Sequence, residues 1–549
     1  MPVSGRIVAR SLVATTAVAL IAAGAVPAAQ ARPTQAEPPS RAALKPRTDF
    51  TMAADGSSGA KVSGERIPNI DSVKSTIRAY YNAKDGIADK TASPYISEMA
   101  EITAKSLAGL PAVDPTAKKA IVLDADDTTL WTYDMEDAAM HFNFDPALQD
   151  VWVQEKKFPA TPSMVAYVNA VQAKGYAVFG LTGRSSAQED ATLANLSTLG
   201  YTGFNNANFF TKWVAPADQP AYVTCATAKC TTVEYKANTR KHIEQDLGYD
   251  IALNVGDQWS DLQGGYADAA LKLPNPTYYL PSPDIAGAPV GDAAMTPQTR
   301  FSMRPDGSSG RTQPGERIPN IDSVKSTIRT YYDATDGIAD KASSPYITQM
   351  DRITTNWARQ VKSSCKAATK PSKSKHHKAR KHRAAVVLDA DDTTLWTYDM
   401  EDAAMHFNFD PALQDVWVQG QKFPATPKMK RVVRAAQRGG CKIVGVTGRN
   451  DGQRKATIAN LNKLYGAGTF KPRFYFTKWT GVGSSTQPSY VTCKTDKCTT
   501  VEYKSQTRRH LKRDLKMTVV ANFGDQFSDL KGGYAKRTYK LPNPTYYLP

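Results

Sequence analysis

The sequence predicts two α/β domains in tandem, each a parallel sheet flanked by helices, with a helical segment at its amino-terminal end. The first reason is an internal repeat: Val122–Gln154 reappears unchanged as Val387–Gln419, and both copies end on KLPNPTYYLP. The second reason is that short apolar runs alternate with amphipathic helical patterns in each copy, which is typical of a parallel sheet. A repeat of roughly 250 residues indicates a duplicated domain, because solenoid repeats are only about 20–50 residues long.

The repeat divides the 549-residue chain into five segments. A chain of this length is too long for one hydrophobic core. We expect a signal peptide at 1–31, a disordered linker at 32–63, a first domain at 64–281, a second linker at 282–314 and a second domain at 315–549.

The amino-terminal segment has the pattern of a secretory signal. Arg6 and Arg10 precede an apolar stretch, Leu12–Val26, and Ala29-Gln30-Ala31 resembles a cleavage site. The apolar stretch is shorter than the roughly 20 residues that a membrane-spanning helix needs. We therefore expect an exported, extracellular protein with no stable membrane insertion.

The charge is unevenly distributed along the chain. Residues 1–300 contain 26 Lys and Arg against 31 Asp and Glu, whereas residues 301–549 contain 43 against 21. Part of the excess lies in a basic insert, residues 366–383, which carries eight Lys and Arg, no acid, and has no counterpart in the first copy. Two interpretations stay open: the insert binds anionic polymers, or it is a solvated loop.

The six cysteines fit an oxidising compartment. Two pairs share one spacing and one sequence context, and the third pair exists only in the second copy, where the first copy has Asp114 and Tyr176. CxxxxC suits a bridged hairpin, or half of a zinc site, although neither copy has a second Cys/His pair nearby. We expect three disulfides: Cys225–Cys230, Cys493–Cys498 and Cys365–Cys441.

The first copy contains three apolar runs that have the length of buried strands. These are Ala120–Leu123, Ala177–Leu181 and Ile251–Val255. Helical patterns lie at 70–80, after Ser93-Pro94, and at 162–174, 186–199 and 235–247.

Each apolar run stops at a polar cluster, and the carboxyl ends of parallel strands meet at one edge of the sheet, where ligands bind. In the first copy the clustered residues are Asp124, Asp126, Thr128, Thr182, Gly183, Arg184, Asp257 and Asp261, with Lys236 on the preceding helix. In the second copy they are Asp389, Asp391, Thr393, Thr447, Gly448, Arg449, Asp525 and Asp529, with Lys504.

These residue types suit metal-assisted phosphoryl transfer. Asp124 and Asp257 offer the hard oxygen ligands that Mg²⁺ prefers. A carboxylate such as Asp124 can attack phosphorus and form an acyl phosphate. Asp126 is placed to protonate the leaving alcohol and later to activate water, and Lys236 offers positive charge to the phosphoryl oxygens.

The ordered set DxDxT, Thr-Gly-Arg, an isolated Lys and GDxxSD resembles the haloacid dehalogenase (HAD) superfamily. The helical amino-terminal segment and the KLPNPTYY ending resemble its secreted acid phosphatase branch, which includes plant vegetative storage proteins. The resemblance covers about 64–281 and 315–549 and implies a Rossmann-like fold and hydrolysis of small phosphomonoesters.

The resemblance also implies a role for each clustered residue. The nucleophiles are Asp124 and Asp389, the acid/bases Asp126 and Asp391, and the phosphate-binding residues Thr182, Gly183, Lys236, Thr447, Gly448 and Lys504. One Mg²⁺ per domain is expected on Asp124, Asp126 and Asp257, and on Asp389, Asp391 and Asp525. Supporting residues are Thr128, Asp261, Thr393 and Asp529.

Other interpretations compete with this one. A calcium-binding EF-hand loop starting at Asp124 needs Gly and Glu where Thr129 and Met135 stand. A non-catalytic storage or anionic-polymer-binding protein on the same fold is the alternative function. Arg184 is expected either to bind phosphate or to form a structural salt bridge, and Trp131 either to stack on substrate or to pack.

Overall fold

A computed structural model describes residues 69–289, 291–292, 295, 318, 320–370, 383–480, 487–495 and 497–548. We call residues 69–289 the first repeat and residues 320–548 the second repeat. The predicted signal peptide, the first linker, part of the second linker and residues 371–382 of the basic insert lie outside the described residues. No helix in the described ranges is long and apolar enough to cross a membrane.

Each repeat contains one five-stranded sheet in which every strand pair is parallel, so the predicted α/β class is confirmed. The first sheet has the order β3-β2-β1-β4-β5, and the second has the equivalent order β8-β7-β6-β9-β10. The strands of the first are β1 Lys119–Leu123, β2 Ala177–Ser185, β3 Phe209–Lys212, β4 Asp250–Gly256 and β5 Ala270–Lys272. Those of the second are β6 Arg383–Leu388, β7 Lys442–Asn450, β8 Tyr475–Lys478, β9 Met517–Gly524 and β10 Thr538–Lys540.

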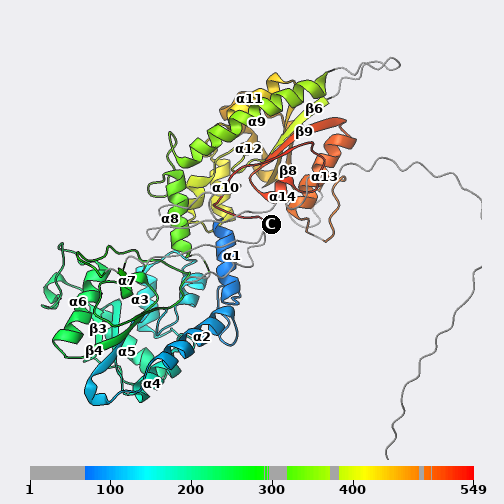
Figure 1. Ribbon diagram of the computed structural model, residues 1–549. Helices are drawn as coiled ribbons and strands as arrows, with labels where there is room; N and C mark the ends of the chain where they lie inside the picture. Colours follow the sequence, from blue (N-terminus) through cyan, green and yellow to red (C-terminus); the bar gives the residue numbers. More distant parts are fainter. Residues whose placement is uncertain are drawn as a thin grey trace, which may run out of the picture. The chain divides into compact units, whose positions relative to one another are not determined.

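Helices flank both sheets. In the first repeat they are α1 Ile70–Tyr80, α2 Pro94–Gly109, α3 Pro146–Gln154, α4 Met164–Ala173, α5 Glu189–Thr198, α6 Thr232–Gln245 and α7 Trp259–Leu262. In the second they are α8 Ile321–Tyr332, α9 Pro345–Thr369, α10 Pro411–Gln419, α11 Met429–Arg438, α12 Arg454–Tyr465, α13 Thr500–Arg513 and α14 Phe527–Leu530. In the second repeat α9 and α11 lie side by side, while α13 and α14 lie together elsewhere on the sheet (Figure 1).

Local sequence explains where several helices begin. The Asn69 side chain accepts hydrogen bonds from the first turn of α1, and Ser93 does the same for α2, where Pro94 is the first helical residue. Thr231 and Glu234 form a capping box at the start of α6. The observed helices therefore begin within a few residues of the predicted patterns.

The strand β2 is longer than predicted. It was expected to stop at Leu181, yet Thr182, Gly183 and Arg184 continue it as far as Ser185. The reason is the neighbouring strand β3: its pairing with β2 shifts in register after Leu181 and resumes between Ser185 and Lys212. Residues at the end of β2 thus have strand geometry, in which successive side chains point to opposite faces.

Three disulfides join the predicted cysteine pairs. The bridge Cys225–Cys230 closes an irregular loop before α6, and no strands flank it, so the expected hairpin is wrong there. The bridge Cys365–Cys441 joins α9 to the residue preceding β7.

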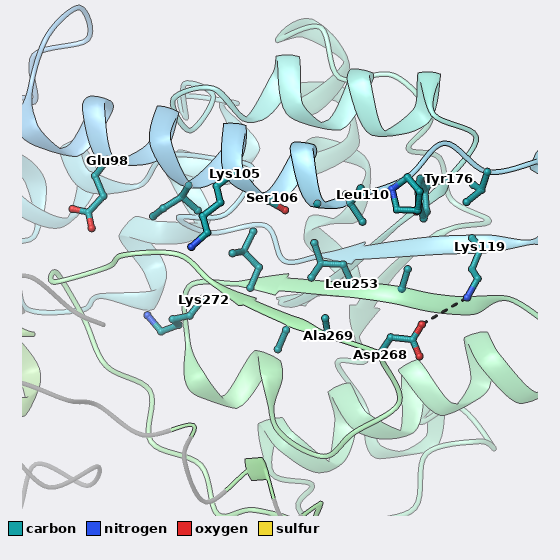
Figure 2. A pocket seen from close by; sticks show the side chains of 17 residues that line it. Glu98, Lys105, Ser106, Leu110, Lys119, Tyr176, Leu253, Asp268, Ala269 and Lys272 are labelled. Atoms are coloured by element: carbon teal, nitrogen blue, oxygen red, sulfur yellow. Dashed lines mark ion pairs between the residues drawn. The ribbon is translucent and has the colours of Figure 1, made fainter. Parts of the chain in front are cut away.

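A hollow of about 880 Å³ lies behind the first sheet, between α2 and the strands β4 and β5. Figure 2 shows Lys105 and Ser106 on the helix side and Leu253 on the strand side, with Lys119 and Asp268 paired at one end. This hollow is separate from the carboxyl edge of the sheet, where the polar clusters gather.

Candidate active site

The predicted cluster forms at the carboxyl end of β1, the central strand of the first sheet. Asp124 follows β1 directly, and its main-chain N–H donates to Val255 O on β4 at 3.1 Å, which continues the pairing into the site. The Lys236 ammonium on α6 lies 2.6 Å from a carboxylate oxygen of Asp124 and 2.6 Å from one of Asp261. All three side chains are buried. Asp124 and Asp261 together raise the pKa of Lys236 above its ordinary value, although burial alone would lower it.

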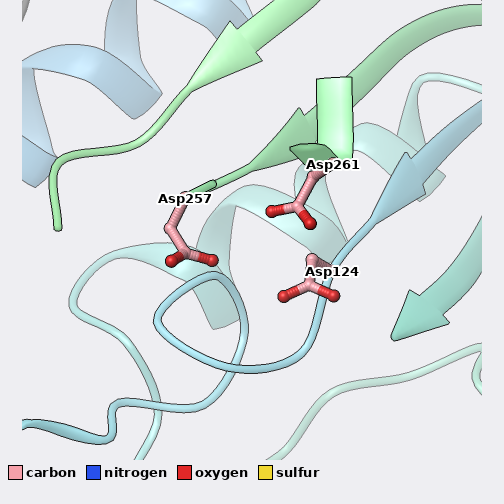
Figure 3. A group of neighbouring side chains, drawn as sticks. All are labelled: Asp124, Asp257 and Asp261. Atoms are coloured by element: carbon pink, nitrogen blue, oxygen red, sulfur yellow. The ribbon is translucent and has the colours of Figure 1, made fainter. Parts of the chain in front are cut away.

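Three carboxylates converge next to this lysine. Asp124, Asp257 and Asp261 come from the ends of β1 and β4 and from α7, and each offers an oxygen within 4.8 Å of the others (Figure 3). Gly256 permits the close approach, because a Cβ there would lie 2.5 Å from the Cβ of Asp261. Burial, followed by the neighbouring Asp261, raises the pKa of Asp257 to about 6.

The acids exceed the cations around this cluster. Asp127 is buried near Asp257, and burial together with Asp257 raises the pKa of Asp127 to about 8. Neither carboxylate forms an ion pair with any described residue; Asp257 accepts instead from the amides of Gln258 and Asn275, at 2.7 and 2.8 Å. Buried carboxylates are normally neutralised by a cation or by protonation. The residues present therefore fit a divalent cation with oxygen ligands.

The second predicted carboxylate, Asp126, is held by an arginine. Arg184 on β2 donates from Nη2 to Asp126 Oδ1 at 2.6 Å and from Nε to Oδ2 at 3.1 Å. Its guanidinium also lies 4.9 Å from the ring centroid of Phe158 and donates to Thr192. Of the two roles expected for Arg184, the structure shows the salt bridge.

The end of β2 contributes unequally to the cavity. A cavity of about 500 Å³ opens onto the cluster, and Gly183 and Arg184 line it. Thr182 is buried and is not among the lining residues; its hydroxyl accepts from the main-chain N–H of Arg184 at 3.2 Å. Thr128 Oγ1 donates to Asp257 Oδ1 at 3.2 Å.

The second repeat reproduces these contacts. Lys504 lies 2.7 Å from Asp389 and 2.5 Å from Asp529, Arg449 lies 2.6 Å from Asp391, and Thr393 donates to Asp525 at 3.1 Å. Asp389, Asp525 and Asp529 form the corresponding carboxylate cluster. Thr447 accepts from the N–H of Arg449 at 3.2 Å, and Gly448, like Gly183, is exposed.

Aromatic residues after the first cluster pack inside the protein. Trp131 is buried and stacks on Tyr95 of α2, with ring centroids 5.3 Å apart. The Tyr133 hydroxyl donates to Asp137 at 2.8 Å. Of the two roles expected for Trp131, the structure shows packing.

Sequence reasoning missed several polar residues around the cluster. Asn275 and Gln258 donate hydrogen bonds to Asp257, and the buried Glu136 and Tyr278 line the cavity. Asn275 and Tyr278 belong to the repeated KLPNPTYYLP segment, which marked the end of the repeat but was assigned no role. Its exact duplication was the available signal.

Comparison with known proteins connects this arrangement to a family. The model of the HAD superfamily, subfamily IIIB (acid phosphatase), matches residues 59–281 and 336–549. The chain belongs to this acid phosphatase family. The two matched regions indicate tandem copies of the family's domain.

The individual relatives match over lengths shorter than one repeat. Acid phosphatase 1 of Solanum lycopersicum is 29% identical over 175 residues, which are 30% of this chain and 63% of that protein. Vegetative storage protein 1 of Arabidopsis thaliana is 26% identical over 177 residues, 30% of this chain and 60% of that protein. The Stem 28 kDa glycoprotein of Glycine max is 32% identical over 139 residues, 25% of this chain and 50% of that protein. The chain thus spans about half to just under two thirds of these relatives.

Among solved structures, the Class C acid phosphatase from Bacillus anthracis is 19% identical, with a TM-score of 0.26, over 35% of this chain and 70% of that chain.

Proposed function

We propose that the protein is a secreted, Mg²⁺-dependent acid phosphatase that hydrolyses small phosphomonoesters through an aspartyl-phosphate intermediate at two active sites. The observation that carries the proposal is the agreement between the repeats. The Lys–Asp and Arg–Asp distances around Asp124 and Asp389 differ by no more than 0.1 Å.

In the first step Asp124 is the nucleophile. Its carboxylate oxygen bonds to phosphorus while the bond from phosphorus to the leaving-group oxygen breaks, and that oxygen takes a proton from Asp126. In the second step Asp126 takes a proton from water as the water oxygen bonds to phosphorus. The bond from Asp124 to phosphorus then breaks, inorganic phosphate leaves, and Asp126 is protonated again.

The surrounding residues position these groups. Arg184 fixes the Asp126 carboxylate, and Lys236 orients Asp124 while offering positive charge to the phosphoryl oxygens. Thr182 and the main-chain N–H groups that follow it at the end of β2, including that of Gly183, are the groups proposed to hold phosphate oxygens. A Mg²⁺ ion held by Asp124, Asp257 and the main-chain carbonyl of Asp126 would supply positive charge that offsets the charge on the phosphoryl oxygens.

The same roles are proposed for the second repeat. Asp389 is the nucleophile, Asp391 the acid/base, Thr447, Gly448 and Lys504 bind phosphate, and Asp525 completes the metal site. Thr128, Asp261, Thr393 and Asp529 support the metal ligands and the lysines.

Hydrolysis of an aryl phosphate, with and without EDTA, tests the proposal in four variants of the full chain. Asp124→Asn and Asp389→Asn should each leave one working site, and the double variant should lose activity by about 10³-fold or more, as covalent catalysts do without their nucleophile. Asp218→Asn, which changes an exposed carboxylate away from both sites, is the control. Full activity in the double variant or in EDTA would contradict the proposal.

The alternative function is a non-catalytic storage protein, and some relatives are named as vegetative storage proteins. Such a protein has no need for buried, mutually repelling carboxylates. The complete set in both repeats therefore favours the enzyme, and the aryl phosphate assay separates the two functions.

Export and anionic polymers form a further part of the proposal. Disulfides persist in oxidising compartments, and the three bridges support secretion. The basic insert begins in the last turn of α9 and ends at Arg383, the first residue of β6, whose opposite end carries Asp389. We infer that its positive charge can hold the protein to an anionic polymer without covering the second site.

A further inference from the structure

The start of α8 in the second repeat contacts the chain that follows β5 in the first. The Asn320 side-chain amide donates to the main-chain carbonyls of Asn275, at 3.1 Å, and Tyr278. The main-chain N–H of Ile321 donates to Pro276 O at 2.9 Å. In the other direction, the N–H of Tyr279 donates to Asp322 Oδ2 at 3.3 Å. We call residues 275–280 the first clamp segment.

The first clamp segment also holds the proposed metal ligand Asp257. The Asn275 amide donates to Asp257 Oδ2 at 2.8 Å. The main-chain N–H of Leu280 donates to the side-chain oxygen Oε1 of Gln258 at 2.9 Å, and the side-chain amide Nε2 of Gln258 donates to Asp257 Oδ2 at 2.7 Å. Both hydrogen bonds that orient this carboxylate oxygen thus depend on a segment fixed by the other repeat.

The arrangement is reciprocal. Residues 543–548 form the second clamp segment. Its Asn543 amide donates to Asp525 at 2.9 Å, and the N–H of Leu548 donates to the Gln526 side-chain carbonyl, whose amide donates to Asp525 at 2.8 Å. The start of α1 holds it: Asn69 donates to Asn543 O at 3.1 Å, Ile70 N–H donates to Pro544 O at 2.8 Å, and Tyr547 N–H donates to Asp71 at 3.1 Å.

A buried lysine also joins each helix, α8 or α1, to the opposite repeat. Buried Lys325 of α8 donates to the carbonyl of Phe142 and to Asn143 of the first repeat, and it also bonds Asp322. Asp322 in turn lines the first cavity. Lys74 makes the matching contacts with Phe407 and Asn408. All of these contacts involve segments that are identical in the two repeats, so one surface meets a copy of itself, as in a two-fold interface.

We infer that each site is completed by the opposite repeat: Asn320 and Asp322 are positioning residues for Asp257, and Asn69 and Asp71 are positioning residues for Asp525. This inference rests on the proposed function in taking the carboxylate clusters as metal sites. It predicts that a change in one repeat alters metal binding in the other.

Asn320→Asp separates this role from helix capping. Aspartate keeps the side-chain oxygen that caps α8 but loses the amide that donates to Asn275 and Tyr278. Asn69→Asp is the matched variant for the second site.

The experiment measures Mn²⁺ binding by electron paramagnetic resonance in the full chain. Asp389→Asn removes a ligand from the second site and leaves the first as the site measured. In this background Asn320→Asp should weaken Mn²⁺ binding by about 10-fold or more, the scale of changes to outer partners of metal ligands, and Asn69→Asp should do so by much less. In the Asp124→Asn background, where the second site is measured, Asn69→Asp should weaken Mn²⁺ binding by about 10-fold or more and Asn320→Asp by much less.

The conservative variant at Asp322 gives a second test. Asp322→Asn keeps an oxygen for Tyr279 N–H, whereas Asp322→Ala removes it. With the first site measured, we expect Asn to restore most of the Mn²⁺ affinity that Ala loses. Equal loss in both variants would overturn the role of this contact.

The outcomes separate the two claims. Effects confined to the repeat that carries the substitution, or a parent that binds no Mn²⁺, would overturn the inference. Mn²⁺ binding with the expected crossed pattern, but without phosphatase activity in the parents, would support the inference and contradict the proposed function.

Discussion

The two repeats have the same side-chain contacts at the carboxyl edge of the sheet, but the packing between the sheet and the helix α2 or α9 differs. In the first, the hollow of about 880 Å³ between α2 and the sheet is lined by Ser106 and Leu271. In the second, Trp357 and Tyr539 occupy the equivalent positions, with ring centroids 5.3 Å apart, and Tyr539 stacks on Phe523. The hollow that remains near this helix, about 400 Å³, is lined by polar side chains.

The helices above these hollows also differ. α2 ends at Gly109, and Pro111 follows shortly after, whereas α9 continues to Thr369 and is tied to the sheet by Cys365–Cys441. Both kinds of packing support one site geometry. The comparison indicates that the geometry of the carboxyl edge is constrained closely, while the packing between the sheet and α2 or α9 needs only to fill space and bury apolar surface.

Removing the disulfide Cys365–Cys441 should change the free energy of unfolding more than any other substitution described below. The bridge closes a loop of 76 residues, and in the loop-entropy model Cys365→Ala with Cys441→Ala should cost about 4.5 kcal/mol of unfolding free energy. Denaturant unfolding monitored by the activity of each single-site variant should show the second site failing first. The matched control, Cys493→Ala with Cys498→Ala, opens a short ring and should cost about 2 kcal/mol. Equal losses in the two pairs would contradict the entropic explanation.

Removing the Trp357 side chain should make the packing between α9 and the second sheet resemble that between α2 and the first sheet. Trp357 packs on Phe523 and Tyr539, and Trp357→Ala should cost about 3 kcal/mol, the range for losing a large side chain. Ser106→Ala at the equivalent position should change the free energy by about 1 kcal/mol or less, through the hydrogen bond to Tyr167. Thermal unfolding measures both. A neutral Trp357→Ala would show that the aromatic contacts add no stability.

Metal binding should depend on pH in the same way at both sites. Burial and a neighbouring aspartate raise the pKa of Asp257 and of Asp525 to about 6 from an ordinary 3.8. In the metal-free folded protein each of these carboxyls keeps its proton up to about pH 6, whereas in the unfolded chain it loses the proton near pH 3.8. Protonation therefore stabilises the folded state at low pH, and this contribution to the free energy of unfolding is lost as pH rises through about 6.

A divalent cation requires the ionised carboxylates, so its affinity should instead fall by up to about tenfold per pH unit below about pH 6. Mn²⁺ titrations of the two single-site variants between about pH 4.5 and 7.5 test this expectation. We expect the two curves of Mn²⁺ affinity against pH to run in parallel. Midpoints more than about one pH unit apart would show that the two sites are not equivalent.

The basic insert should produce the smallest difference between the repeats, and it should be seen only in binding to an anionic polymer. Residues 371–382 lie outside the described residues, so this prediction rests on their charge. Replacing the five cations there with glutamine should lower the salt needed for elution from heparin, because each lost phosphate-like contact reduces the salt dependence by about one. The positions are Lys373, Lys375, Lys378, Arg380 and Lys381.

A control variant changes five exposed lysines elsewhere in the second repeat. They are Lys422, Lys430, Lys455, Lys463 and Lys471. Equal elution of the two variants would show that the general charge of the second repeat, and not the insert, causes retention.

Much of the fold followed from local pattern. The apolar run Ala120–Leu123 became β1, and the run at Ile251 became β4, because a buried strand between helices needs apolar side chains on both faces. The gathering of Asp124, Asp257 and Lys236 followed as well, since parallel strands end at one edge. The length of β2 did not follow from local pattern, because the register of its pairing with β3 determines where it ends.

The duplication, the α/β class and the residues that gather at each carboxyl edge can all be read from the amino-acid sequence. The hydrogen-bond partners of Asn320 and of the clamp segments follow only from the three-dimensional contacts. Asn320 satisfies the rules of helix capping whether or not its amide reaches Asn275, so local sequence is silent on the second contact. Which repeat's helix holds which site depends on how two identical surfaces meet, and identical sequences contain no information that favours contact within a repeat over contact across repeats.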